Sequence, residues 1–143
     1  MARTKAALAT ALAASAAFVG RQGDVAILRV SALPGSDRKE RKRDRGRVIL
    51  AYGEVTGHAH AIADKKVIHF DTDDAVEAAN HLLASIGVDA RLSEHNAPSF
   101  LAVEEAATVE HDEHAPIALD PGNYLAVRQR EWSDAEEPIQ VAD

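Results

Sequence analysis

Short apolar segments separated by turn residues are the feature that most constrains this 143-residue chain. Each segment holds three to nine residues rich in valine, isoleucine, leucine and aromatic side chains, a composition typical of β-strands. Clusters such as Leu33-Pro34-Gly35-Ser36 mark turns between them. Seven or eight short strands with turn signals predict a mainly β domain, as a small barrel or a sandwich. The predicted strands cover 24–30, 47–52, 56–63, 66–70, 100–103, 108–110, 116–119 and 124–132.

The N-terminal segment has a different composition, because nine of its first twenty residues are alanine. Alanine is the best helix former, and Leu8, Leu12 and Val19 form a thin apolar stripe at helical spacing. Residues 1–22 are therefore predicted to form a helical arm. Since a helix this short is marginal in water, we expect it to dock on the β domain or on another chain.

The same segment also has features of a secretory signal, with Arg3 and Lys5 before an alanine-rich stretch and Ala14-Ser15-Ala16 after it. The stretch contains only two leucines and is interrupted by Thr10, so we favour the helical arm. We expect a cytoplasmic protein, or a virion protein if it belongs to a phage. No membrane partner is expected, since no apolar run is long enough to cross a bilayer.

A second helix is predicted inside the β domain, over about 72–87. Val76, Ala79, Leu83 and Ile86 recur at spacings of three and four, and acidic residues precede the first turn. Gly87 supplies a C-terminal stop. The segment is too short for a second domain, so we predict one β domain over 23–132 with an inserted helix.

Charge is distributed unevenly along the chain. Residues 1–47 carry a formal charge of +7, from 11 basic and 4 acidic residues, whereas residues 48–143 carry −14, from 5 basic and 19 acidic residues. We predict a basic loop over 36–47 within the β domain and an acidic tail over 133–143 after it. Such a chain can neutralise itself, bind nucleic acid or associate with copies of itself.

The basic loop has no aromatic residue on which bases could stack, and acids interrupt it. We therefore do not expect nucleic acid as a partner, and predict a solvated loop or a contact with an acidic protein surface through Arg41 and Arg43. Tyr124 and Trp132 lie on one face of the last predicted strand. They could anchor an interface or cover one end of the core.

Two histidine pairs carry the main chemical signal. His58 and His60 alternate on a predicted strand, so their side chains share one face. His111 and His114 lie between two later strands. If the segments are neighbours, the first pair and one histidine of the second could hold one divalent ion of Zn, Fe, Mn or Ni. A structural pair or a pH-sensitive cluster are the other interpretations. Candidate supporting carboxylates are Glu54, Asp112 and Glu113.

The spacing Gly53-x4-His58-x-His60, a later histidine and Pro121-Gly122 before a long strand resemble a cupin, a double-stranded β-helix. The resemblance implies a metal held by His58, His60 and a histidine of the second motif. Two departures stand out: only Asp64 follows the first motif as a carboxylate, and His111 and His114 precede Pro121 rather than follow it. The segments at 53–60 and 124–132 are also similar to short uncharacterised proteins of bacteria and phages.

Several kinds of chemistry are excluded. The chain has no cysteine, which rules out a disulfide scaffold, thiolate zinc sites, iron–sulfur clusters and a cysteine nucleophile. It has no nucleophile-elbow, P-loop or dinucleotide-binding motif, so we assign no catalytic residue and favour a protein that is not an enzyme. The first hypothesis is a metal-binding β domain. The alternative is a structural subunit of an assembly such as a phage capsid, which contacts its neighbours through the arm, the basic loop and the acidic tail.

Overall fold

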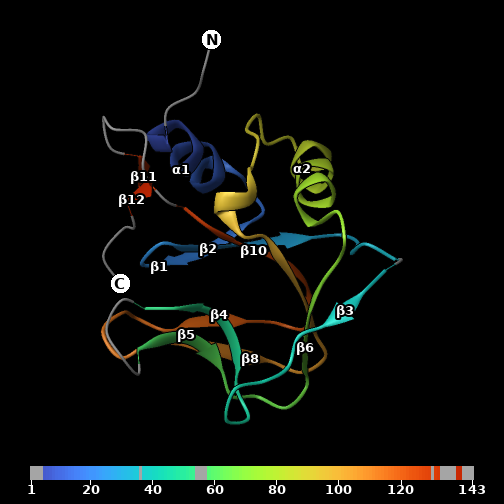
Figure 1. The fold of residues 1–143 in the computed structure, drawn as a ribbon, viewed down its shortest axis with the longest axis vertical. Coiled ribbons are helices and arrows are strands. Elements are labelled where there is room, and N and C mark those ends of the chain that lie inside the picture. Colours follow the sequence, from blue (N-terminus) through green and yellow to red (C-terminus); the bar gives the residue numbers. More distant parts are fainter. Residues whose placement is uncertain (1–4, 36, 54–57, 130, 133–137, 140–143) are drawn as a thin grey trace.

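The computed structural model describes residues 5–35, 37–53, 58–129, 131–132 and 138–139. Over these residues the chain is mainly β, as predicted, with an N-terminal helix and one inserted helix (Figure 1). The elements are α1 (Lys5–Ala14), β1 (Phe18–Gln22), β2 (Val25–Val30), β3 (Lys39–Glu40), β4 (Val48–Tyr52), β5 (Ala59–Ile62), β6 (Val67–Asp71), α2 (Ala75–Ser85), the 3-10 turn η1 (Glu94–Asn96), β7 (Ser99–Val103), β8 (Ala107–Glu110), β9 (Ile117–Leu119), β10 (Gly122–Arg128), β11 (Glu131–Trp132) and β12 (Pro138–Ile139).

Ten of the strands form two antiparallel sheets. The larger sheet has the order β1-β2-β10-β7-β6-β3, and the smaller has the order β4-β5-β8-β9. The described strands do not close into a barrel, so the sandwich is the correct form of the predicted β domain. In the larger sheet the central strand β10 pairs with β2 on one side and with β7 on the other.

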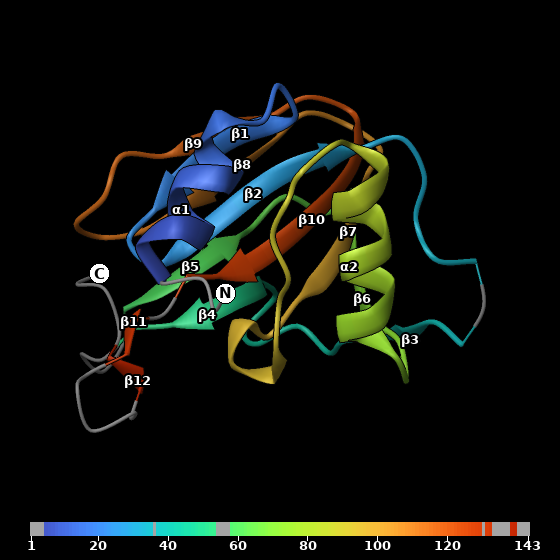
Figure 2. The same cartoon turned by 90° about the horizontal axis from the view of Figure 1, so that it is seen from above.

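The main core lies between the two sheets. Side chains such as Ile27 and Leu101 from the larger sheet meet Ile62 and Val109 from the smaller, and all four are fully buried. The other face of the larger sheet packs against the helices through Leu28, Phe100 and Leu125, among others. Figure 2 shows α1 and α2 over that face, with the segment that leads from α2 to η1 between them. Because β2 and β10 lie in the middle layer, both of their faces are buried, which explains their continuous apolar sequences.

The N-terminal prediction is correct for only part of its length. Helix α1 ends at Ala14, and the predicted arm over 1–22 is wrong for its last five residues, which form β1. Strand β1 turns at Gly23, which has a positive φ of 57°, and pairs with β2 in a hairpin. Pairing with a neighbouring apolar strand outweighs the helical spacing of Val19, whose side chain is partly exposed on the sheet.

Strand β10 is shorter than the predicted strand over 124–132. It ends at Arg128, and β11 is a separate two-residue strand that pairs with β12. Of the predicted acidic tail, β12 is described, whereas 133–137 and 140–143 lie outside the described residues. No helix in the described part of the chain combines the length and apolar character needed to cross a membrane.

Candidate histidine cluster

Strand β5 and the residue before it position the first histidine pair. All four residues of this strand are buried, and the side chain of His60 has no exposed surface. His58 precedes the strand and is partly exposed, with 22% of its side-chain surface accessible. The pair therefore runs from the rim of the sandwich to its interior.

The loop between β8 and β9 brings the second histidine pair against the first, because β8 pairs directly with β5. The ring centroids of His60 and His111 are 4.4 Å apart, those of His111 and His114 are 4.8 Å apart, and those of His58 and His111 are 5.8 Å apart. The four histidines that the sequence selected thus form one cluster, which we call the histidine cluster.

The buried histidine is also part of a polar network that the sequence pattern did not reveal. Gln22, at the end of β1, accepts a hydrogen bond from His60 Nδ1 at 2.8 Å and donates to the carbonyl oxygens of Val109 and Ala115. Because the Gln22 amide nitrogen is committed to those carbonyls, its oxygen faces the imidazole, and His60 Nδ1 must carry a proton. The second ring nitrogen, Nε2, therefore faces the other side of the cluster.

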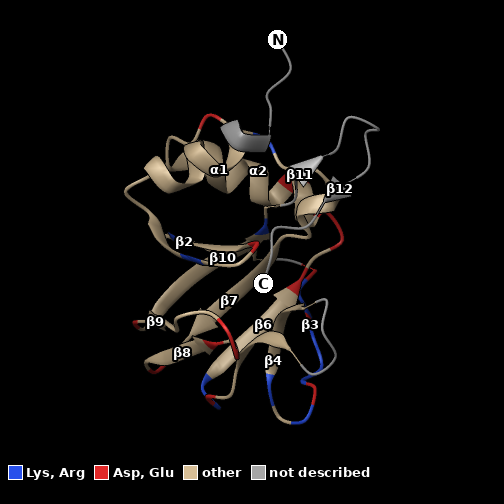
Figure 3. Ribbon diagram, turned by 90° about the vertical axis from the view of Figure 1, so that its left-hand side faces the viewer, with Lys and Arg blue, Asp and Glu red and all other residues tan. Residues whose placement is uncertain are grey.

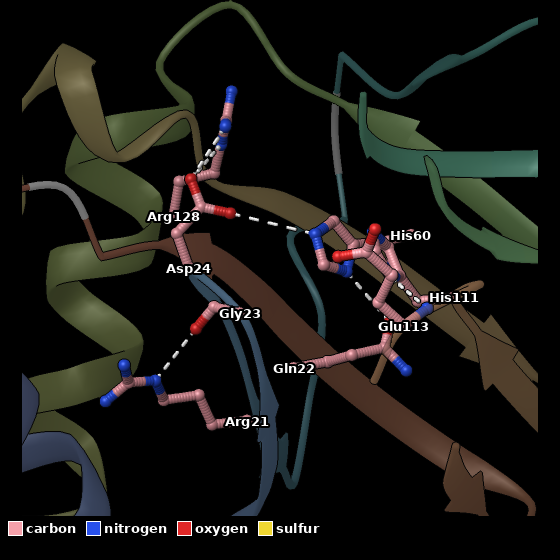
Figure 4. Close-up of polar contacts among 8 residues, drawn as sticks. All are labelled: Arg21, Gln22, Gly23, Asp24, His60, His111, Glu113 and Arg128. Atoms are coloured by element: carbon pink, nitrogen blue, oxygen red, sulfur yellow. Dashed lines mark hydrogen bonds and ion pairs between the residues drawn. The ribbon is translucent and has the colours of Figure 1, made fainter. Parts of the chain in front are cut away.

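That other side is occupied by Asp24, a fully buried carboxylate that lies immediately before β2. Its Oδ2 accepts hydrogen bonds from Arg128 Nη2 at 2.6 Å and Nε at 3.0 Å. Its Oδ1 lies 3.8 Å from His60 Nε2 (Figure 4). The local sequence does not mark Asp24 as a residue of the site, and its contact with Arg128 joins positions far apart in the chain. They meet because β2 and β10 pair over their full length.

The two histidines of the second pair differ in how well they can bind a metal. The backbone N–H of Glu113 donates to His111 Nδ1 at 3.1 Å, so that nitrogen is already an acceptor and the ring proton lies on Nε2. His114 Nε2 is buried and has no hydrogen-bond partner among the described residues. Between the two, His114 offers the more available nitrogen.

The supporting carboxylates lie at the exposed rim of the histidine cluster. Asp112 Oδ2 is 3.6 Å from His58 Nε2, and Glu113 Oε1 is 3.5 Å from His58 Nδ1. Both acids are more than half exposed. Glu54, the third candidate, lies outside the described residues.

The side chains of the histidine cluster are not arranged as a complete set of metal ligands. In the described part of the chain, no three histidine or acidic side chains converge on one point. The rings of His60 and His111 are stacked, with 28° between their planes, so their nitrogens do not point at a common centre. A bound ion would require the side chains of the β8–β9 loop to rotate, as residues on an exposed loop can do.

The predicted interface residues have mostly internal roles. Tyr124 is wrong as an interface residue, because it is 1% exposed in the main core and its hydroxyl donates to the carbonyl oxygen of Asp120. Arg41 pairs with Asp71 at 2.9 Å, and Arg43 donates to the carbonyl oxygens of Gly46, Asp64 and Val67. Trp132 lies in β11, and its side chain is outside the described part of the structure.

The basic loop is therefore at least partly neutralised within the chain. Its lysine and arginine residues lie along β3 and in the turn before β4 (Figure 3). Lys39 forms an ion pair with Asp73, next to the Arg41–Asp71 pair. Self-neutralisation, one of the three interpretations of the charge pattern, accounts for these residues.

The three other histidines lie outside the histidine cluster. His81 and His95 are exposed, whereas His69 is buried on β6 and bonded to the Ser99 hydroxyl at 2.8 Å. Burial, together with the nearby Arg41 guanidinium, lowers the pKa of His69 to about 4. His69 is thus a buried neutral side chain of the sheet.

This shift predicts a specific loss of stability in acid. The unfolded chain takes up a proton at this histidine below pH 6.5, while the folded chain resists doing so down to about pH 4. The contribution of His69 to the free energy of unfolding is therefore complete above pH 6.5, and it falls by about 3 kcal/mol as the pH drops to 4. Urea unfolding across this range should show a shallower pH dependence for His69→Asn than for the natural chain. Equal slopes would contradict the assignment.

The fold and the cluster together define a two-sheet β sandwich with a histidine-rich polar end. The chain matches the family model described as "Domain of unknown function (DUF8820)" over residues 21–129, and it belongs to that family. The matched range includes the whole histidine cluster as well as Gln22, Asp24 and Arg128. Comparisons with curated proteins and with solved structures gave no match.

Proposed function

We propose that this protein is a metal-binding β domain that holds one divalent ion at the histidine cluster. The observation that carries the proposal is the juxtaposition of the two histidine pairs, which lie far apart in the sequence and meet through the pairing of β5 with β8. Imidazole nitrogens suit Zn²⁺, Fe²⁺, Mn²⁺ and Ni²⁺, and the unpartnered nitrogen of His114 is a ready donor.

The depth of the cluster suggests how an ion would enter. His58 lies at the rim beside Asp112 and Glu113, whose negative charges favour the approach of a cation. His60 forms the buried floor, and the ring centroids of His111 and His114 lie 4.4 Å and 6.1 Å from its own. A bound ion could stabilise the β8–β9 loop or act as a Lewis acid on a small ligand.

The proposal predicts that Zn²⁺ binding depends on rim and loop histidines. The natural chain should bind one ion per chain in a calorimetric titration, and the His58→Ala/His114→Ala variant should bind on the order of 100-fold more weakly. The matched control is His81→Ala/His95→Ala, which removes two exposed histidines outside the cluster. Equal binding by all three proteins, or no binding by the natural chain, would overturn the proposal.

The alternative function, a structural subunit of an assembly, depends on segments available to neighbours. Here α1 packs on the larger sheet, and residues of the basic loop form contacts within the chain. These internal contacts give the metal-binding proposal priority. Native mass spectrometry tests the alternative, which predicts metal-free oligomers that dissociate when the acidic tail is deleted.

A further inference from the structure

We infer that Asp24 supplies a carboxylate ligand to the ion, so that the centre is a mixed histidine–carboxylate site with a buried floor. The inference rests on the proposed function and names a ligand that the local sequence does not mark. It replaces the exposed acids Asp112 and Glu113 with a carboxylate in the interior.

The first argument is the arrangement around Asp24. Arg128 donates to Oδ2 through two nitrogens, which holds the carboxylate in one orientation. Its other oxygen, Oδ1, is directed at His60 (Figure 4). Neither the aspartate nor the histidine has any exposed side-chain surface. The two groups are thus fixed and face each other inside the protein.

The second argument is the state of the histidine. Because His60 Nδ1–H donates to the Gln22 amide oxygen, the atom that faces Asp24 is Nε2, the nitrogen that carries the lone pair in the neutral ring. Metal-binding histidines commonly donate their other ring N–H to an oxygen, which orients the ring. The Gln22–His60 contact has this form.

The third argument is the separation of 3.8 Å between His60 Nε2 and Asp24 Oδ1. This distance is longer than a direct hydrogen bond, which spans about 2.7 to 3.2 Å. Two atoms bound to one ion by bonds of about 2.1 Å each lie at most roughly 4.2 Å apart. A separation of 3.8 Å is within this limit, so an ion could bind both groups without separation of the strands.

The last argument concerns charge. A divalent cation held only by neutral imidazoles would place two uncompensated positive charges near the guanidinium of Arg128. A carboxylate in direct contact offsets part of that charge, and burial makes this compensation more important than at the rim. The mixed nitrogen and oxygen donors favour Zn²⁺, Mn²⁺ or Fe²⁺ over cations that require thiolate ligands.

The test compares two charge-neutralising variants by Zn²⁺ titration. Asp24→Asn keeps the shape of the side chain and removes its charge, whereas Asp112→Asn/Glu113→Gln removes two charges at the rim. We expect Asp24→Asn to weaken binding on the order of 100-fold and the rim variant to bind within a few-fold of the natural chain. Circular dichroism and urea unfolding establish that each variant is folded.

The outcomes separate the two proposals. If the natural chain and folded Asp24→Asn bind Zn²⁺ equally, Asp24 is not a ligand, while the metal-binding function stands. If the natural chain binds no ion, both proposals fail. Should Asp24→Asn not fold, carboxylate ¹³C NMR of the natural chain decides instead. Addition of Zn²⁺ must then shift the Asp24 resonance more than those of Asp112 and Glu113, and a larger shift at the rim overturns the inference.

Discussion

Replacing Arg128 by methionine is expected to lower the free energy of unfolding by about 3 to 5 kcal/mol. The guanidinium donates two hydrogen bonds to Asp24, whose side chain is fully buried. Methionine retains much of the apolar stem but leaves the carboxylate without this partner. Removal of one member of a buried ion pair costs more than removal of both, because a charge remains in a medium of low polarity. Urea unfolding measures the difference.

Arg21 provides the matched control for this substitution. Its side chain is exposed and donates to the carbonyl oxygen of Gly23, so Arg21→Met should change stability by less than about 0.5 kcal/mol. The double variant Asp24→Asn/Arg128→Met removes both charges and should be more stable than Arg128→Met alone. Equal effects of Arg21→Met and Arg128→Met would show that the buried pair contributes little.

Replacing Leu12 by alanine is expected to destabilise the protein by about 3 to 5 kcal/mol. Leu12 lies on α1, is fully buried, and belongs to the core between the helices and the larger sheet. Truncation removes apolar contacts and leaves a cavity that the sheet beneath cannot fill. Thermal or urea unfolding measures the effect.

The control for this substitution is Ile68→Ala, because Ile68 is an aliphatic side chain on β6 that is 51% exposed. Its truncation should cost less than about 1 kcal/mol. If Leu12→Ala were as mild as Ile68→Ala, α1 would be a loosely docked arm. The large effect expected here instead makes α1 an integral layer of the domain.

Local sequence was sufficient for most of the strands in the two sheets and for α2. Segments such as 25–30 are apolar and β-branched and are bounded by turn residues, so their preference for strand agrees with the fold. The spacing of Val76, Ala79 and Leu83 likewise predicted α2, and two of these residues, Ala79 and Leu83, are buried against the sheet. The helical prediction was wrong for β1, because alanine content and apolar spacing give no information about pairing with a later strand.

For the histidine cluster too, local sequence predicted one part and strand pairing decided the other. The residue types and their spacing, His58 with His60 and His111 with His114, could be selected from the sequence because imidazoles at short intervals are a chemical signal. The sequence could not show that the two pairs meet, because this contact depends on the pairing of β8 with β5. The tertiary structure also distinguished Tyr124, a core residue, from a surface anchor.

The sequence by itself determined the β class, the inserted helix and the four candidate histidines of the site. Only the tertiary structure decided that Gln22, Asp24 and Arg128 join them. Asp24 and Arg128 are separated by 104 positions, and the antiparallel pairing of β2 with β10 places Arg128 beside the start of β2. Contacts of this range depend on strand order and register, which are set by the burial of whole sheet faces and not by the residues adjacent in the chain.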